Sequence, residues 1–104
     1  MNYMNLSNKD KIMDISVNLA RVSDWIFSEN QARQRRVDQF LQEISVYLET
    51  MHDDDFQSRF KHTLQRFRKE FEDLVAERNT LEKYEWAERA LTWANILQHR
   101  AKLA

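Results

Sequence analysis

Apolar residues recur in the first half of the chain at alternating steps of three and four residues, the spacing of one helix face. One stripe begins after Ser7, and Ser is a residue type that caps helix N-termini. A second stripe follows another capping pattern at residues 28–31. The pattern therefore predicts two amphipathic helices. Their stripes are Ile12, Ile15, Leu19, Val22 and Ile26, and then Val37, Phe40, Ile44, Tyr47 and Met51.

A third stripe, made of Phe and Leu, runs from Phe56 to Leu74. The acidic run 53–55 precedes it and fits the first turn of a helix, where carboxylates meet the positive end of the macrodipole. The same phase does not continue beyond Leu74, and residues 79–82 form a further capping pattern. We therefore expect a break near Asn79 and a fourth helix after it. The alternative is one long helix whose buried face rotates.

Four helices of about 20 residues, each about 30 Å long, pack antiparallel when their connections are short. The predicted fold is therefore all-α: an up-down-up-down four-helix bundle that forms a single domain over residues 1–104. Three helices with a long C-terminal helix form the alternative architecture.

Composition narrows the possible chemistry, because the 104 residues include no Gly, Pro or Cys. Phosphate-binding loops and dinucleotide fingerprints need Gly where the backbone approaches phosphate. Thiolate metal sites and cysteine nucleophiles need Cys. We therefore expect a protein that is not an enzyme and that uses no cofactor.

The charge balance and the hydropathy pattern bear on partners and location. The sequence has 16 Lys and Arg against 17 Asp and Glu, a net charge of −1, which does not favour a general polyanion binder. No apolar run approaches the roughly 20 residues that cross a bilayer. The first six residues lack the basic and then apolar pattern of a signal peptide. We expect a cytoplasmic protein with no membrane partner.

Glu49 and His52 have the Glu-x-x-His spacing that places two metal ligands on one helix face. Di-iron bundles need two such pairs and two further Glu, whereas this sequence has one pair. We therefore predict no metal site, and a ligand or metal in the bundle core stays a minor alternative.

Basic residues form a stripe on the expected third helix at steps of three, four and three. Such stripes can follow a phosphate backbone. Acidic residues follow directly, however, and residues 53–78 carry slightly more acidic than basic groups. A regulatory nucleic-acid binder is therefore the alternative function, and nucleic acid is not the expected partner. The candidate basic patch is Arg33, Arg36, Arg59, His62, Arg66 and Lys69.

Apolar residues cover about half of the circumference of the expected last helix, more than a small bundle needs. We expect the edge with Ala87, Leu91 and Ala94 to face the neighbouring helices. The other edge would then meet a protein partner or a second copy, unless the first helix covers it within the chain through Trp25 and Phe27. The predicted function is a non-enzymatic interaction or assembly module that forms a homodimer. The candidate interface is Trp86, Ala90, Trp93 and Leu97.

Overall fold

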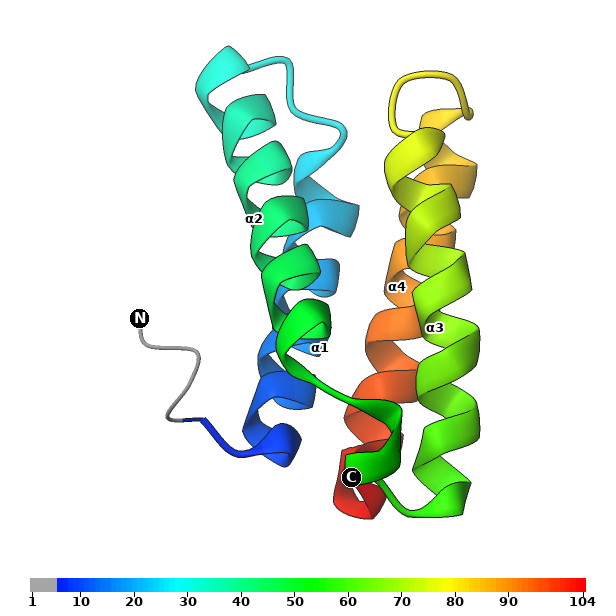
Figure 1. The fold of residues 1–104 in the computed structure, drawn as a ribbon. Coiled ribbons are helices and arrows are strands. Elements are labelled where there is room, and N and C mark those ends of the chain that lie inside the picture. Colours follow the sequence, from blue (N-terminus) through cyan, green and yellow to red (C-terminus); the bar gives the residue numbers. More distant parts are fainter. Residues whose placement is uncertain (1–5) are drawn as a thin grey trace.

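A computed structural model describes residues 6–104 and shows four α-helices (Figure 1). Between residues 6 and 104 there is no strand, and no helix combines the length and the apolar character that crossing a membrane requires. The predicted all-α, four-helix fold is confirmed. The helices are α1 (Asn8–Trp25), α2 (Gln31–Thr50), α3 (Ser58–Ala76) and α4 (Lys83–Arg100), with short 3₁₀ helices η2 (Asp53–Asp55) and η3 (Ala101–Leu103).

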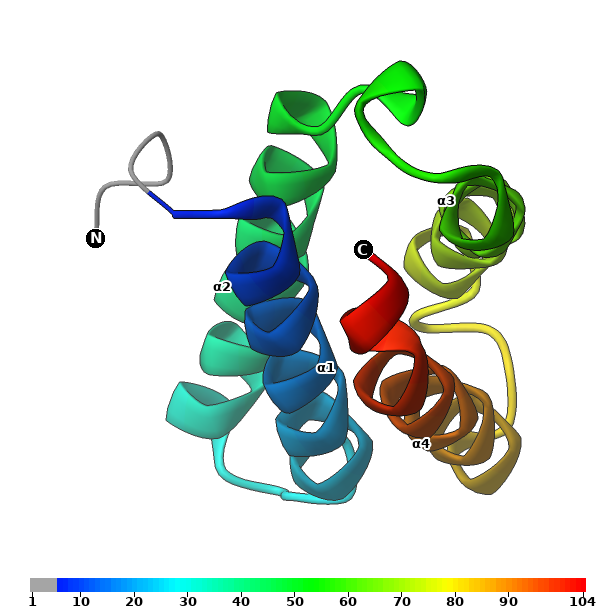
Figure 2. The same ribbon diagram turned by 90° about the horizontal axis from the view of Figure 1, so that it is seen from below.

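Successive helices run in opposite directions along the molecule (Figure 1). α1 packs between α2 and α4, and α3 packs against α4 on its other side (Figure 2). The molecule measures 40 × 27 × 20 Å. The helix pair α3–α4 therefore has one end where α3 begins and α4 finishes, and an opposite end at the α3–α4 turn.

Capping residues set three of the helix starts. The Ser7 hydroxyl accepts a hydrogen bond from the Asp10 N–H at 3.1 Å, as its position predicts. Within the pattern at 28–31, the residue that caps α2 is Asn30, through the N–H groups of the first turn. The break near Asn79 is confirmed, because α3 ends at Ala76 and the Glu82 carboxylate caps α4.

The expectation that the acidic run 53–55 begins the third helix is wrong. These residues form η2, and α3 begins at Ser58. Asp53 accepts a hydrogen bond from the Arg68 Nε at 3.2 Å, and Asp54 accepts one from the Lys61 Nζ at 3.0 Å. The Lys61 hydrogen bond and charge lower the pKa of the Asp54 carboxyl below its usual value. Ion pairs with Lys61 and Arg68 on α3 therefore position the acidic run, and not an interaction with the helix macrodipole.

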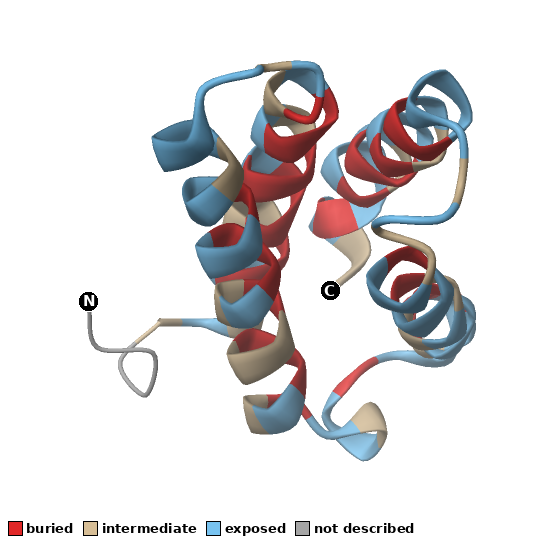
Figure 3. Cartoon of the chain, turned by 90° about the horizontal axis from the view of Figure 1, so that it is seen from above, coloured by how far each residue is buried: buried red, intermediate tan, exposed pale blue. Residues whose placement is uncertain are grey.

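The first three predicted stripes are buried and meet in one core, as the inward-facing buried segments of Figure 3 show. Phe67 is fully buried in this core, and its ring centroid is 5.8 Å from that of Phe71 and 5.5 Å from that of Trp93. The helical spacing of these residues therefore locates the core correctly.

Small residues line the contact between α1 and α4. The buried Ser16 hydroxyl donates a 2.7 Å hydrogen bond to the backbone carbonyl of Ala94. A side chain can reach the backbone of a facing helix only where the two helices approach closely, and side-chain size sets that approach. Ala20, Ala87 and Ala90 supply further small side chains on these two helices. The first and last helices of the chain therefore form a close pair.

Two arginines connect α2 to the α3–α4 half of the molecule. Arg68 on α3 donates to the backbone carbonyls of Leu48 and Met51, which lie at the end of α2, and to Asp53. The Leu48 carbonyl also accepts a hydrogen bond from the Met51 N–H at 3.3 Å, and the last carbonyls of a helix lack the usual partners one turn further on, so the guanidinium completes the α2 C-terminus.

At the other end of the molecule, Arg78 donates to the Asp38 carboxylate at 3.0 Å and to the Gln34 side-chain oxygen at 2.8 Å. The amide nitrogen of Gln34 donates in turn to the backbone carbonyls of Trp25, Ile26 and Ser28. The end of α1, the start of α2 and the α3–α4 turn are therefore joined by one hydrogen-bond network.

Asn18 on α1 provides a test of the core, because its side chain is buried and its amide nitrogen has no hydrogen-bond partner within the described chain. An unsatisfied buried donor costs about 1–3 kcal/mol. We therefore expect Asn18→Leu to raise the free energy of unfolding by roughly 1–2 kcal/mol, measured by urea denaturation with an unchanged slope. The exposed Gln42→Leu is the control and should change little. A less stable Asn18→Leu would show that the amide is satisfied.

Candidate interaction surfaces

The tryptophan edge of α4 is buried within the chain. α3 covers it: the Trp86 Nε1 donates a 2.8 Å hydrogen bond to the Leu74 carbonyl, and the Trp93 ring packs against Phe67. The interface predicted for this edge is therefore corrected, because its side chains belong to the core of a single chain. The buried residues are Trp86, Ala90, Trp93 and Leu97.

The opposite edge of α4 is only partly covered. Ala87 and Ala94 are buried, whereas Leu91 is 44% exposed and Tyr84 is 74% exposed. α1 approaches α4 so closely over the alanines that the larger side chains are left at the margin of the contact. The width of the apolar arc does mark an uncovered edge, but that edge lies opposite the tryptophans.

The uncovered edge of α4 continues onto α1 as one surface, which we call the seam face. Of the five large apolar side chains that are exposed among residues 6–104, four lie on it, and the fifth is Val75 on α3. Sequence periodicity missed this surface because α1 and α4 each contribute only part of it. The four residues are Val17, Phe27, Tyr84 and Leu91.

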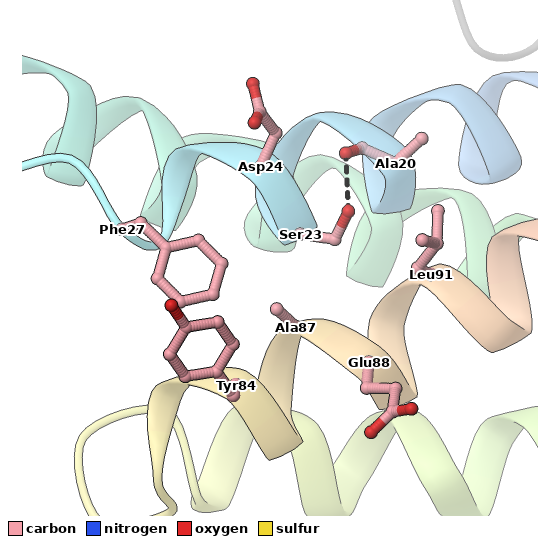
Figure 4. A pocket seen from close by; sticks show the side chains of 8 residues that line it. All are labelled: Ala20, Ser23, Asp24, Phe27, Tyr84, Ala87, Glu88 and Leu91. Atoms are coloured by element: carbon pink, nitrogen blue, oxygen red, sulfur yellow. Dashed lines mark hydrogen bonds between the residues drawn. The ribbon is translucent and has the colours of Figure 1, made fainter.

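The seam face is hollowed between the two helices, as Figure 4 shows. The hollow has a volume of about 590 Å³. At one end the rings of Phe27 and Tyr84 lie together, with centroids 4.9 Å apart. The Ser23 hydroxyl donates to the Ala20 carbonyl at 2.7 Å, so this hydroxyl is already satisfied, and the charged side chains in the lining are Asp24 and Glu88. This surface offers apolar contact and shape, with no reactive group at its centre.

A second surface lies at the end where α3 begins and α4 finishes. It is a groove of about 500 Å³, and no acidic side chain lines it. Of the predicted basic patch, only Arg59 and His62 line this groove. The other basic residues that line it come from α4 and η3 and were not predicted from the sequence. We call this surface the basic groove: Ser58, Arg59, His62, His99, Arg100, Lys102 and Leu103.

The sequence separates basic from acidic stretches along α3 and α4, and the pairing of these two helices brings the basic stretches together at this end. Residues 56–69 and 93–104 contain seven Lys and Arg and no Asp or Glu. Residues 70–92 contain seven Asp and Glu and three Lys and Arg. Because α3 and α4 are antiparallel, the two acid-free stretches lie at the same end (Figure 1). A charge count over 53–78 averages the two ends and conceals this separation.

The rest of the predicted basic patch lies outside the groove. On α3, the Arg66 guanidinium lies 6.0 Å from the Trp93 ring centroid, and Lys69 is exposed further along. Arg33 lies 5.5 Å from the Trp25 ring, and Arg36 lies 5.2 Å from the Phe40 ring.

Arg33 and Arg36 therefore stack on aromatic rings near the start of α2, at the end of the molecule opposite the start of α3 (Figure 1). The structure does not join them to Arg59 and His62.

Glu49 and His52 are both exposed at the end of α2. Within the part of the chain that the structure describes, no three or more His, Cys, Asp or Glu side chains are grouped so that they could hold a metal ion. The single Glu-x-x-His pair thus has no further ligand near it among those residues.

No protein-family model, curated protein or solved structure matches this chain. No residue role is therefore transferred from another protein.

Proposed function

We propose that the chain is a non-enzymatic assembly module that pairs with a second copy of itself through the seam face. The supporting observation is that, among residues 6–104, four of the five exposed large apolar side chains gather on this one face. Monomeric proteins rarely leave extended apolar patches in water, and such patches mark interaction sites. A cytoplasmic location remains a prediction of the sequence.

Charge favours a second copy in antiparallel orientation. Asp24 and Glu88 line the part of the seam face nearest the α3–α4 turn, whereas the part towards the other end adds Arg21, Asn95 and Gln98, with Asp24 at the border of the two parts. A two-fold axis across the face would set the acidic part of one copy against the part of the other that holds Arg21, Asn95 and Gln98. A parallel arrangement would oppose like charges, which costs several kcal/mol. Two-fold symmetry would also bury the same apolar residues twice.

Sedimentation equilibrium tests this proposal. We expect the wild type to form dimers and Val17→Glu with Leu91→Glu to be a folded monomer, because pairing would bury four carboxylates in each dimer. The dissociation constant should rise roughly 100-fold or more, equivalent to about 2.8 kcal/mol. Val75→Glu is the matched control, because Val75 is 45% exposed, as Leu91 is 44% exposed, but lies on α3 away from the seam face.

The control should dimerise like the wild type, and circular dichroism should show helical spectra for all three proteins. A wild type that stays monomeric at the highest concentration tested would overturn the proposal. A dimer that survives both glutamates would place the interface elsewhere.

A further inference from the structure

Two electrostatic features of the basic groove are unfavourable in the folded chain when no ligand is bound. Arg59, Lys61 and His62 lie in the first turns of α3, at the positive end of its macrodipole, where anions are favoured. No acidic residue lies in that first turn, and no side chain caps the helix. Gathering like charges in one groove adds repulsion. A bound anion would relieve both.

The cations of the groove are also uncompensated. Lys61 and Arg68, which point elsewhere, are paired with Asp54 and Asp53. By contrast, Arg59 and Lys102 form no ion pair with any described residue. Arg100 donates to the Thr63 hydroxyl at 3.0 Å and has no carboxylate partner within residues 6–104. Three permanent positive charges therefore face a cavity without a counter-charge in its lining.

We propose that the basic groove binds a compact polyphosphate, either inorganic or the di- or triphosphate of a nucleotide. Arg59, Arg100 and Lys102 supply three positive charges, which match a chain of two or three phosphates better than a single phosphate. His62 and His99 add ring nitrogens that can donate hydrogen bonds to phosphate oxygens. Arginine in particular recognises phosphate through paired N–H donors.

A compact ligand is favoured over a nucleic-acid strand because the groove's cations come from two helices and meet at one end of the molecule. A strand would need a continuous track, and α3 beyond Arg66 and Lys69 continues into the acidic residues Glu70, Glu72 and Asp73. The electrostatic surface therefore ends within the length of one helix.

Isothermal titration with inorganic tripolyphosphate tests the proposal. We expect saturable one-to-one binding by the wild type at near-physiological salt. Arg59→Gln with Lys102→Gln should weaken it at least tenfold. The matched control is Arg66→Gln with Lys69→Gln, which removes the same charge from α3 outside the groove and should weaken binding less than threefold. Circular dichroism should show that both variants stay folded.

Two further titrations separate the sources of phosphate. A nucleoside triphosphate that binds more tightly than tripolyphosphate would identify a nucleotide site, and equal affinity would identify a site for the phosphates alone. Absent binding of tripolyphosphate, or equal weakening by both variants, would overturn the proposal. Tighter binding of a single-stranded oligonucleotide, weakened as strongly by the control variant, would replace it with a nucleic-acid surface.

Discussion

Replacing Phe67 by alanine is expected to lower the free energy of unfolding by about 3–5 kcal/mol. The ring is fully buried and packs against Phe71 on its own helix and against Trp93 on α4. Its loss removes apolar burial and leaves a cavity at the junction of two helices. For a domain with a total stability of about 5–15 kcal/mol, this is a large fraction. Urea unfolding followed by circular dichroism measures it.

Val75→Ala is the control, because Val75 is on the same helix but exposed. Its effect should stay within about 0.5 kcal/mol, as for most surface substitutions. Protein concentration should be the same for each variant, since self-association makes apparent stability depend on concentration. A loss below about 1 kcal/mol for Phe67→Ala would mean that the core closes around the gap far better than cores usually do.

Arg68→Met should cost about 2–3 kcal/mol, although methionine keeps much of the aliphatic volume. The substitution removes one donor each from the Leu48 carbonyl, the Met51 carbonyl and the Asp53 carboxylate. The Arg68 side chain is 31% exposed, so water can replace part of the lost bonding. This partial replacement keeps the expected cost below that of a fully buried charge.

Lys69→Met is the matched control for Arg68→Met, because it removes a neighbouring positive charge that forms no ion pair with any residue from 6 to 104. Equal stabilities for the two variants would mean that net charge, and not the bonding of the α2 end, accounts for the effect of Arg68. A large loss of stability for Arg68→Met but not for Lys69→Met would show that the guanidinium's hydrogen bonds stabilise the end of α2.

Periodicity was sufficient to predict the four helices and most of the core. Stripes such as Ile12 to Ile26 stay on one face because the helical repeat fixes where they point. The interruption between α3 and α4 was predictable, because the apolar stripe loses its phase after Leu74 and a capping pattern follows at residues 79–82. On α4, periodicity gave the width of the apolar arc but not which edge is covered. That depends on side-chain size: α1 packs over the alanines, and Trp86 and Trp93 fill the space beside α3.

The basic groove was not predictable from one helix at a time. Arg59 and Lys102 are 43 positions apart in the printed sequence, and they meet only because α3 and α4 are antiparallel. The acid-free stretches 56–69 and 93–104 were a usable signal. Matching charge segments across a predicted helical hairpin would have found it, whereas a running charge count could not.

The close contact between α1 and α4 has a consequence for how the chain acquires its structure. Ser16 and Ala94, which it joins, are 78 positions apart, so most of the chain lies inside the loop that this contact closes. During synthesis from the N-terminus, α1 and α2 emerge while the surface that covers α1 is still missing. The core therefore closes only after α4 has emerged, and loss of α4 would uncover α1 and α3 together. We therefore expect protease resistance to appear only once α4 has packed against α1, because transiently exposed apolar surface persists until then.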